Sequence, residues 1–223
     1  MVELSTLLIG PPGTGKTGLV RKLAQCLLCP RLDDQTLNPC NRCSSCEKLT
    51  YLEGNDSIDS RIDSTEYIFS PIDCTRTKDG VLEDRLMDLK SSPGIVRVAH
   101  LEEVGSLGER SQDYALLVPM DDRGFIWIGT GMTAQGLSTA FLRRFPVKMR
   151  MSLPTKDELA LWLTKRCRER GIKCESLEVM RRLAERAQFR PGYGLQVVNF
   201  SESLNPKVIT KEIVEDFLFD FDN

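Results

Sequence analysis

The chain has 223 residues, a formal net charge of −2 and an isoelectric point near 5.6. That length suits one α/β domain with a smaller second domain, and the slightly acidic balance excludes a protein that binds nucleic acid through overall positive charge. The sequence holds no run of about 18 apolar residues and no basic-then-apolar start, so we expect neither a membrane-spanning helix nor a secretory signal.

A strand, a glycine-rich loop and a helix are predicted at the start of the chain. Residues 7–9 form an apolar run suited to a buried strand, and Leu19, Leu23 and Leu27 recur at helical spacing. The loop between them contains the pattern G-x-x-x-x-G-K-[ST] and comprises Gly10, Pro11, Pro12, Gly13, Thr14, Gly15, Lys16, Thr17 and Gly18. Because the pattern stands between a strand and a helix, it predicts a phosphate-binding loop.

The residue types of this loop explain how it would bind a nucleotide. Glycines at positions 10, 13 and 15 allow tight turns that aim backbone N–H groups at phosphate oxygens, and the helix N-terminus adds its positive dipole end. Lys16 would reach the β- and γ-phosphates, and the Thr17 hydroxyl would bind Mg²⁺. The alternative is a glycine- and proline-rich turn without a ligand.

Five of the eight cysteines follow this helix or end it, between residues 26 and 46. A C-x2-C-x2-C run spans residues 40–46, and Cys29 lies eleven residues upstream of Cys40. A nucleotide-binding loop favours a cytoplasmic protein, in which thiols stay reduced and clustered cysteines more often hold metal. Four thiolates suit a closed tetrahedral Zn²⁺ site. Residues 29–46 therefore predict a structural zinc knuckle with the ligands Cys29, Cys40, Cys43 and Cys46.

Three alternatives to this assignment stay open. Cys26 forms a C-x2-C pair with Cys29 and could replace it as a ligand, although it also suits a small buried thiol one helical turn earlier. The cluster could hold an iron–sulfur centre, or its cysteines could be free of metal. The other cysteines, Cys74, Cys167 and Cys174, are isolated in the sequence and need no functional interpretation.

Strands and helices alternate in the predicted middle of the chain. Residues 51–66 are polar and predict a loop. Strands are expected at residues 67–72, 95–101 and 125–129, and helices at residues 81–89 and 114–118. Such alternation predicts a parallel sheet with helices on its faces, and thus an α/β fold.

The pattern changes near Met151. Apolar residues then recur at helical spacing within residues 159–167, 177–187 and 213–218. We therefore expect a nucleotide-binding domain at residues 1–150 and a small all-helical domain at residues 151–223.

Two acidic residues, Glu102 and Glu103, end the strand predicted at residues 95–101. In an ATPase with a phosphate loop, the first acid after such a strand helps to hold Mg²⁺ and the second polarises the attacking water. A solvated strand end is the alternative. His100, the only histidine of the chain, falls on the same strand and is expected to be packed there rather than catalytic.

At this point the sequence resembles the AAA+ ATPases, and among them the clamp-loader subunits of the bacterial DNA polymerase III gamma/tau and delta-prime type. The phosphate loop at residues 10–17 and the cysteine insertion directly after its helix carry the resemblance. Residues 98–104 look like the Walker B strand, and Thr130 is similar to the sensor-one polar residue. Arg144 falls within residues 142–145, where the family has a Ser-Arg-Cys motif.

The resemblance implies a P-loop AAA+ fold with a zinc-knuckle insertion, a helical lid and the cofactors ATP, Mg²⁺ and Zn²⁺. It implies that Glu102 helps to bind Mg²⁺ and that Glu103 and Thr130 act on the attacking water. Arg144 would be an arginine finger that reaches the γ-phosphate in a neighbouring subunit. The implied partners are other AAA+ subunits in a ring, with a sliding clamp and primed DNA contacted through the complex and no membrane.

The sequence departs from the family pattern at four places. The family usually has Asp before Glu in Walker B, whereas both residues here are Glu, and Arg-Arg-Phe stands in place of Ser-Arg-Cys. Residues 191–196 hold no sensing arginine for the lid, so Arg190 is only a nearby candidate. Nine residues precede the phosphate loop, where the family has a segment over the adenine, so we expect a trimmed or compact variant.

These features leave three functional hypotheses. The first is a clamp-loader-like AAA+ ATPase that binds and hydrolyses Mg-ATP to drive assembly of a DNA replication or repair complex. The second is a nucleotide-binding adaptor or assembly subunit with little turnover, which the Glu-Glu pair and the missing sensor arginine favour. The third is an AAA+ ATPase of a phage-defence or mobile-element system that carries the same zinc module.

Overall fold

A computed structural model describes residues 4–51, 62–63, 67–76, 82, 84, 86–87, 96–108, 112, 116–121 and 124–218. The chain divides into two compact units, one of residues 1–10 and 16–150 and the other of residues 11–15 and 151–223. Each unit has its own hydrophobic core. No helix within the described residues is both long enough and apolar enough to cross a membrane.

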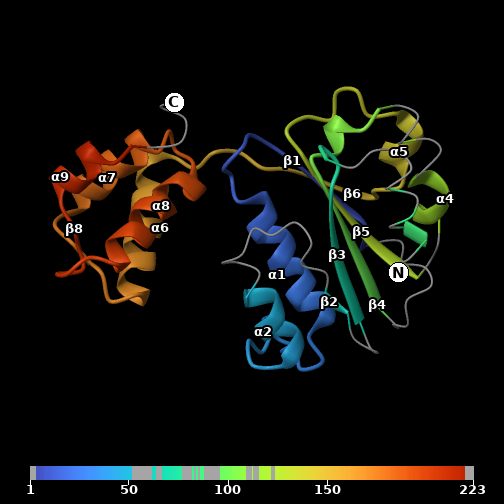
Figure 1. Cartoon of the computed structure of the whole chain (residues 1–223), viewed down its shortest axis with the longest axis horizontal. Coiled ribbons are helices and arrows are strands. Elements are labelled where there is room, and N and C mark those ends of the chain that lie inside the picture. Colours follow the sequence, from blue (N-terminus) through green and yellow to red (C-terminus); the bar gives the residue numbers. More distant parts are fainter. Residues whose placement is uncertain are drawn as a thin grey trace. The chain divides into compact units, whose positions relative to one another are not determined.

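The described part of the larger unit is built on a six-stranded sheet with the strand order β2-β3-β4-β5-β1-β6 (Figure 1). Five strands are parallel and β2 pairs antiparallel with β3 at one edge, so the predicted parallel sheet is confirmed. The strands are β1 (Thr6–Ile9), β2 (Ile62–Asp63), β3 (Tyr67–Asp73), β4 (Val96–Glu102), β5 (Phe125–Gly131) and β6 (Val147–Arg150).

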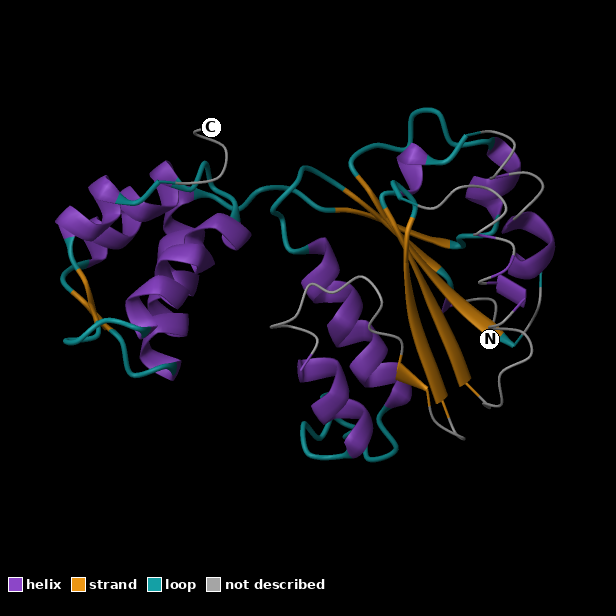
Figure 2. Ribbon diagram, in the orientation of Figure 1, coloured by secondary structure: helices purple, strands orange, loops and turns teal. Residues whose placement is uncertain are grey.

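Helices cover both faces of this sheet (Figures 1 and 2). On one face lie α1 (Lys16–Leu28) and α2 (Ser44–Tyr51), and on the other lie α4 (Leu117–Met120) and α5 (Thr139–Arg143). A 3-10 turn, η2 (Val104–Ser106), follows β4 directly.

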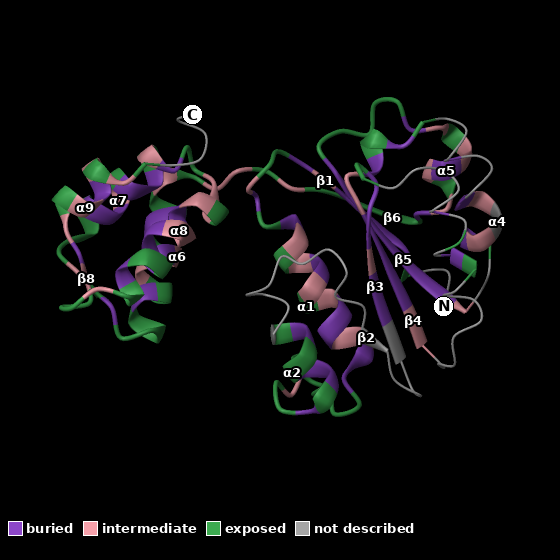
Figure 3. Cartoon of the chain, viewed as in Figure 1, coloured by how far each residue is buried: buried purple, intermediate pink, exposed green. Residues whose placement is uncertain are grey.

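The alternation of side chains along each strand determines which residues face the helices on either side of the sheet. Leu101 and Trp127 belong to the core cluster that also contains Phe141 of α5. Successive side chains of a strand point to opposite faces, so His100 and Ile128 point toward α1. Figure 3 shows β5 as a buried strand, whereas β6 is exposed along its whole length at the edge of the sheet.

The face of α1 that is buried differs from the predicted face by a shift of one residue along the sequence. Leu19, Leu23 and Leu27 are only half-buried, whereas Val20 and Ala24 are fully buried. Both sets repeat every four residues, so the helix itself is confirmed. The smaller pair lies on the sheet because short side chains let the helix approach the strands closely.

Three predicted segments are described only in part. Of the predicted loop at residues 51–66, Tyr51 ends α2 and Ile62–Asp63 form β2, and the remainder lies outside the described residues. Within the predicted helix at residues 81–89, positions 82, 84, 86 and 87 are helical, and Leu82 and Leu86 join the core. The predicted helix at residues 114–118 is described only from Leu116, and α4 begins at Leu117.

The smaller unit packs α6 (Lys156–Glu169), α7 (Leu177–Arg186), α8 (Pro191–Glu202) and α9 (Lys211–Asp216) around its own core. A capping box starts α6: the Thr155 side chain accepts from the Glu158 amide, and the Glu158 carboxylate accepts from the Thr155 amide at 2.8 Å. Ser176 and Thr210 cap the N-termini of α7 and α9, where each side-chain hydroxyl accepts one hydrogen bond from a backbone amide of the first turn.

The expectation of an entirely helical unit is wrong in one detail. Two short strands, β7 (Lys173–Cys174) and β8 (Val208–Ile209), form a parallel pair within the described residues. Strands of two residues are too short to show alternation in a sequence. The helix α8 was also not predicted, because Pro191 and Gly194 suggest a turn. Pro191 instead occupies the first helical turn, and Gly194 leaves room for the side chain of Leu163.

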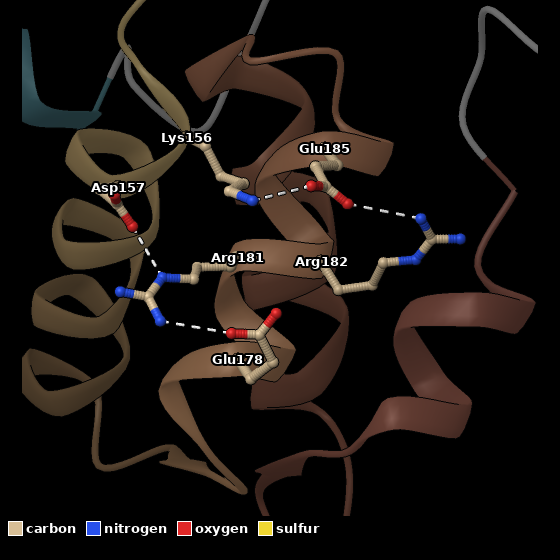
Figure 4. Close-up of polar contacts among 6 residues, drawn as sticks. All are labelled: Lys156, Asp157, Glu178, Arg181, Arg182 and Glu185. Carbon is tan, nitrogen blue, oxygen red and sulfur yellow. Dashed lines mark hydrogen bonds and ion pairs between the residues drawn. The ribbon is translucent and has the colours of Figure 1, made fainter.

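Ion pairs join the outer faces of α6 and α7 (Figure 4). Nε of Arg181 lies 2.7 Å from Oδ1 of Asp157, and Nζ of Lys156 lies 3.1 Å from Oε1 of Glu185. Solvent screens these exposed groups, so the buried apolar residues contribute most of the stability of this unit.

Candidate functional site

The phosphate loop leaves the end of β1 and enters α1. Gly13 and Gly15 have φ values of 74° and 88°, which residues with a side chain rarely adopt. Gly10 has a different role: its amide donates a hydrogen bond of 3.1 Å to the carbonyl oxygen of Gly131 at the end of β5. The first glycine of the motif therefore joins the loop to the sheet.

The other residues of the loop differ in exposure. Thr14 is buried, and its Oγ1 donates to the Pro11 carbonyl oxygen at 2.9 Å, which closes the turn. Thr17 is half-buried in the first turn of α1. The exposed residues of the loop are Pro11, Pro12, Gly15 and Gly18.

Lys16 is buried, and its ammonium group folds back over the loop. Its Nζ donates to the Gly10 carbonyl oxygen at 2.8 Å. Burial lowers the pKa of Lys16, and the nearby charge of Glu103 opposes this shift. The structure thus brings together two of the residues that the sequence assigned to nucleotide chemistry.

Glu102 and Glu103 lie where β4 ends. Glu102 is the last residue of the strand, and Glu103 has φ and ψ of 53° each, in the left-handed region. A residue with a side chain pays about 1 kcal/mol or more for this conformation. Strained backbone is enriched at active sites, and the position of Glu103 agrees with the role that the sequence predicts for it.

Thr130 is buried inside β5 rather than just after it. Its Oγ1 lies 3.2 Å from Nε2 of His100 and 3.4 Å from the carbonyl oxygen of Leu101. Nδ1 of the same histidine lies 3.6 Å from a carboxylate oxygen of Glu102. Burial lowers the pKa of His100 to about 3, with a smaller effect of Arg21, so the ring is neutral near pH 7.

A third carboxylate at this edge was not singled out from the sequence. Asp73 ends β3 and pairs in register with Glu102. Its Oδ1 accepts hydrogen bonds from the amide and hydroxyl of Thr75, at 2.8 and 2.6 Å. Burial, with the neighbouring carboxylates, raises the pKa of Cys74 to about 12, so that thiol stays protonated. The sequence does contain a signal for Asp73. The strands predicted at residues 67–72 and 95–101 are each followed directly by a carboxylate.

Arg144 caps the C-terminus of α5. Its Nε and one terminal nitrogen contact the two carboxylate oxygens of Asp121 at 3.1 and 2.9 Å. Another nitrogen donates to the Ala140 carbonyl oxygen at 3.2 Å. The structure therefore places Arg144 in a bidentate ion pair with Asp121 of its own chain, while Arg143 beside it is exposed.

Within the smaller unit, Arg190 lies against the middle of the phosphate loop. A Cβ atom on Gly13 would lie 2.9 Å from the Cβ of Arg190, and the Gly192 amide donates to the Gly13 carbonyl oxygen at 3.3 Å. The Arg190 guanidinium stacks on Tyr193, and its buried Nε has no hydrogen-bond partner among the described residues.

The predicted cysteine ligands converge in space. One sulfur from each lies within 4.8 Å of all the others, and the four residues are Cys29, Cys40, Cys43 and Cys46. A zinc tetrahedron with bonds of about 2.3 Å has sulfur–sulfur separations of about 3.8 Å, so a small contraction would suffice for binding. Cys26 is not in the cluster: its thiol contacts the Leu37 carbonyl oxygen at 3.5 Å.

Backbone geometry in the knuckle suits thiolate ligands. The Cys40 amide points at the sulfur of Cys29 at 3.4 Å, and the Cys46 amide points at the sulfur of Cys43 at 3.5 Å. The Arg42 amide is the main cause of a Cys40 pKa of about 6, whereas burial raises the pKa of Cys46 to about 12. The donor set fits Zn²⁺, and such a closed site would be structural.

Gln25 holds this knuckle on α1 and was not recognised from the sequence. Its side chain is fully buried and donates to the Cys46 carbonyl oxygen at 3.2 Å and to the Thr50 hydroxyl at 2.9 Å. A glutamine among helical leucines gives no distinct signal in one sequence, because its partners lie more than 20 residues away.

Comparisons with solved structures show the same fold in a branch migration motor. The RuvB Holliday junction branch migration motor of Thermotoga maritima aligns with 95% of this chain at 17% identity and a TM-score of 0.62. A variant of the same RuvB aligns with 95% at 16% identity and a TM-score of 0.63. The chain spans 59% of the length of each of these proteins. At this identity the likeness concerns the fold alone.

Sequence comparison identifies the family. A search of curated proteins found no match. The family model described as "ATPase family associated with various cellular activities (AAA)" matches residues 6–153, which include the phosphate loop, the cysteine cluster and all six strands of the sheet. The chain belongs to the AAA family of ATPases.

Proposed function

We propose that this ATPase binds Mg-ATP at residues 10–18 and hydrolyses it as a subunit of a clamp-loader-type assembly. The observation that carries the proposal is the cysteine cluster at residues 29–46, which directly follows the phosphate-loop helix and is docked on it through Gln25. A phosphate loop alone is shared by many ATPases, whereas this insertion narrows the resemblance to clamp-loader subunits.

The residues around the loop suit the reaction. Lys16 would neutralise the β- and γ-phosphates once released from the Gly10 carbonyl oxygen. The Thr17 hydroxyl and the Glu102 carboxylate offer the oxygen ligands that Mg²⁺ prefers. Glu103 would polarise the attacking water and Thr130 would help to position it. Bound Mg-ATP would supply the phosphoryl group and the charge that these residues stabilise.

The assembly would complete the site. Arg144 would act in trans on the γ-phosphate of a neighbouring subunit, after leaving its pair with Asp121. Arg190, beside Gly13, would serve as the nucleotide-sensing arginine of the lid at residues 151–223. Zn²⁺ would hold the knuckle closed, and a sliding clamp and primed DNA would be reached through the complex in the cytoplasm.

A second candidate function is a nucleotide-binding assembly subunit with little turnover. The pair between Arg144 and Asp121 favours it, because Arg144 cannot reach a neighbouring subunit for as long as this pair holds it. The longer side chain of Glu102, where the family usually has Asp, favours it as well. Placement of the gene among phage or mobile-element genes would favour the defence-type ATPase instead.

The deciding experiment measures Mg-ATP binding and turnover with and without primed DNA. We compare the wild type with Lys16→Ala, with Glu103→Gln and with Lys165→Ala as a matched control, since Lys165 is an exposed lysine of the lid unit. The proposal expects binding to vanish in Lys16→Ala, turnover but not binding to vanish in Glu103→Gln, and both to persist in Lys165→Ala.

Dependence of the specific rate on protein concentration would support a finger supplied in trans. Tight binding with a slow rate that Glu103→Gln leaves unchanged would favour the assembly subunit. Absence of Mg-ATP binding by the wild type would refute both functions.

A further inference from the structure

A histidine interrupts the most buried part of the sheet. His100 is the third residue of the buried run from Val98 to Leu101 in β4, and the whole residue is 1% exposed. The ring stacks on Phe69 of the neighbouring strand, with centroids 6.5 Å apart. A polar ring in this position has to find partners for two nitrogens, because an unpartnered buried polar group is costly.

Both nitrogens face residues of the candidate site. Nε2 lies 3.2 Å from Oγ1 of Thr130 on β5, and Nδ1 lies 3.6 Å from a carboxylate oxygen of Glu102 on its own strand. Alternation places all three side chains on the face of the sheet that α1 covers. One ring therefore contacts both Thr130, for which the sequence analysis predicts water positioning, and Glu102, for which it predicts Mg²⁺ binding.

The charge of Glu102, whose carboxylate oxygen lies 3.6 Å from Nδ1, favours one form of the neutral ring. With its hydrogen on Nδ1, the ring presents an N–H to the Glu102 carboxylate and accepts from the Thr130 hydroxyl at Nε2. With its hydrogen on Nε2, it would aim a lone pair at the carboxylate, which is unfavourable. In the first form Thr130 directs its hydrogen to His100 rather than to the Leu101 carbonyl oxygen, which is the longer contact at 3.4 Å.

We propose that His100 is a positioning residue that holds the side chains of Thr130 and Glu102 in one shared arrangement for ATP hydrolysis. The proposal rests on the proposed function, because it assigns Thr130 and Glu102 to that reaction. His100 itself is buried behind them and would not touch the nucleotide. It acts by removing alternative rotamers of the two residues, so its loss lowers the rate of the chemical step more than it weakens binding.

Side-chain substitutions separate the two contacts. His100→Phe keeps a ring on Phe69 and removes both nitrogens. His100→Gln can place an amide near the former Nε2 and restore the contact to Thr130, and His100→Asn can do so near Nδ1 for Glu102. Phe69→Leu is the matched control, since it alters the stacking partner and leaves the polar contacts in place.

The kinetic test compares kcat and KM for ATP with the midpoint of thermal unfolding. We expect His100→Phe to lower kcat about 10- to 100-fold with KM changed less than threefold, and His100→Gln to recover part of the loss. Phe69→Leu should keep kcat within about twofold. Equal kcat losses in His100→Phe and Phe69→Leu would overturn the proposal, because they would point to packing alone.

A second measurement does not depend on turnover. His100 is the only histidine, so ¹⁵N-labelled histidine gives one set of ring signals. We expect the form with hydrogen on Nδ1, a change at Nε2 in Thr130→Val and a change at Nδ1 in Glu102→Gln. A ring with its hydrogen on Nε2, or ring signals unchanged in both variants, would overturn the proposal. Absence of ATP turnover in the wild type, with the expected ring signals, would refute the proposed function and leave these contacts established.

Discussion

The side-chain amide of Gln25 donates a hydrogen bond of 3.2 Å to the carbonyl oxygen of Cys46, the last residue of the four-cysteine cluster. Gln25 belongs to α1, whose first residue is Lys16, and Cys46 belongs to α2. The phosphate loop and the cysteine cluster are therefore placed at the two ends of one helix. The knuckle at residues 29–46 is attached to the nucleotide-binding unit by a buried polar contact.

This contact makes Gln25 a stability residue of the knuckle. Gln25→Met keeps the size of the side chain but removes its hydrogen bonds to Cys46 and Thr50. We expect the free energy of unfolding to fall by about 1–3 kcal/mol and a chelator to extract zinc faster. Denaturant unfolding and absorbance of a zinc-binding dye measure the two effects.

The matched control is Lys22→Met. Lys22 is exposed, and its Nζ donates to the side-chain carbonyl oxygen of Gln25 at 2.8 Å, so its loss leaves the contacts of Gln25 to α2 intact. Zinc extraction from Gln25→Met at the rate of this control would contradict the assigned role.

The cluster geometry also predicts which cysteines hold the metal. Cys29→Ser should abolish stoichiometric zinc, because the other three thiolates cannot close the tetrahedron. Cys26→Ser should retain one zinc per chain, since its sulfur faces the Leu37 carbonyl oxygen outside the cluster. Elemental analysis of the purified variants measures the ratio. Retained zinc in Cys29→Ser with loss in Cys26→Ser would reverse the assignment.

The sequence predicted the frame of the molecule because its signals are local. The apolar run before the phosphate loop, the alternation of strands and helices, and the spacing of Cys40, Cys43 and Cys46 each lie within a short stretch. What it missed depends on contacts between distant segments. Val20 rather than Leu19 faces the sheet, and α8 forms despite Pro191, because neighbouring elements decide these points.

The site shows the same division. Motif order named Lys16, Thr130 and the acidic pair as candidates. It could not predict that His100 contacts both Thr130 and Glu102. His100 was expected to be a packed residue, and it is packed. Its functional interest comes from the two nitrogen contacts, which depend on the register of β4 and β5 and cannot be deduced from the strand sequence alone.

The ion pair between Arg144 and Asp121 predicts that removing the charge of Asp121 raises ATP turnover. Asp121→Asn removes the charge that holds the guanidinium, so we expect turnover in concentrated protein to rise several-fold. If Arg144 acts as the proposed arginine finger, Arg144→Ala should lower that turnover at least 100-fold, with unchanged Mg-ATP binding.

The neighbouring Arg143 provides the control for this experiment. It is exposed beside Arg144, so Arg143→Ala removes a similar charge from the same surface. Rates should be measured over a wide range of protein concentrations. An equal loss in the two alanine variants would reject Arg144 as the finger.

The buried imidazole of His100 predicts a pH dependence of stability. Burial lowers its pKa from 6.5 to about 3, so between these values the unfolded chain binds a proton that the folded chain excludes. Stability from this group is fully present above pH 6.5 and is lost as the pH falls toward 3. From pH 7 to pH 5 the loss would be about 2 kcal/mol, at about 1.4 kcal/mol for each unit of pH below 6.5.

The measurement compares urea unfolding of the wild type and His100→Phe at pH 7, 6 and 5. Carboxylates also titrate in this range, but they do so in both proteins, so the difference between the two curves isolates the histidine. We expect the wild type to lose about 2 kcal/mol more than the variant between pH 7 and pH 5. Parallel curves would mean that the folded chain accepts the proton, and then a charged ring would sit between Thr130 and Glu102 instead of the neutral one assigned here.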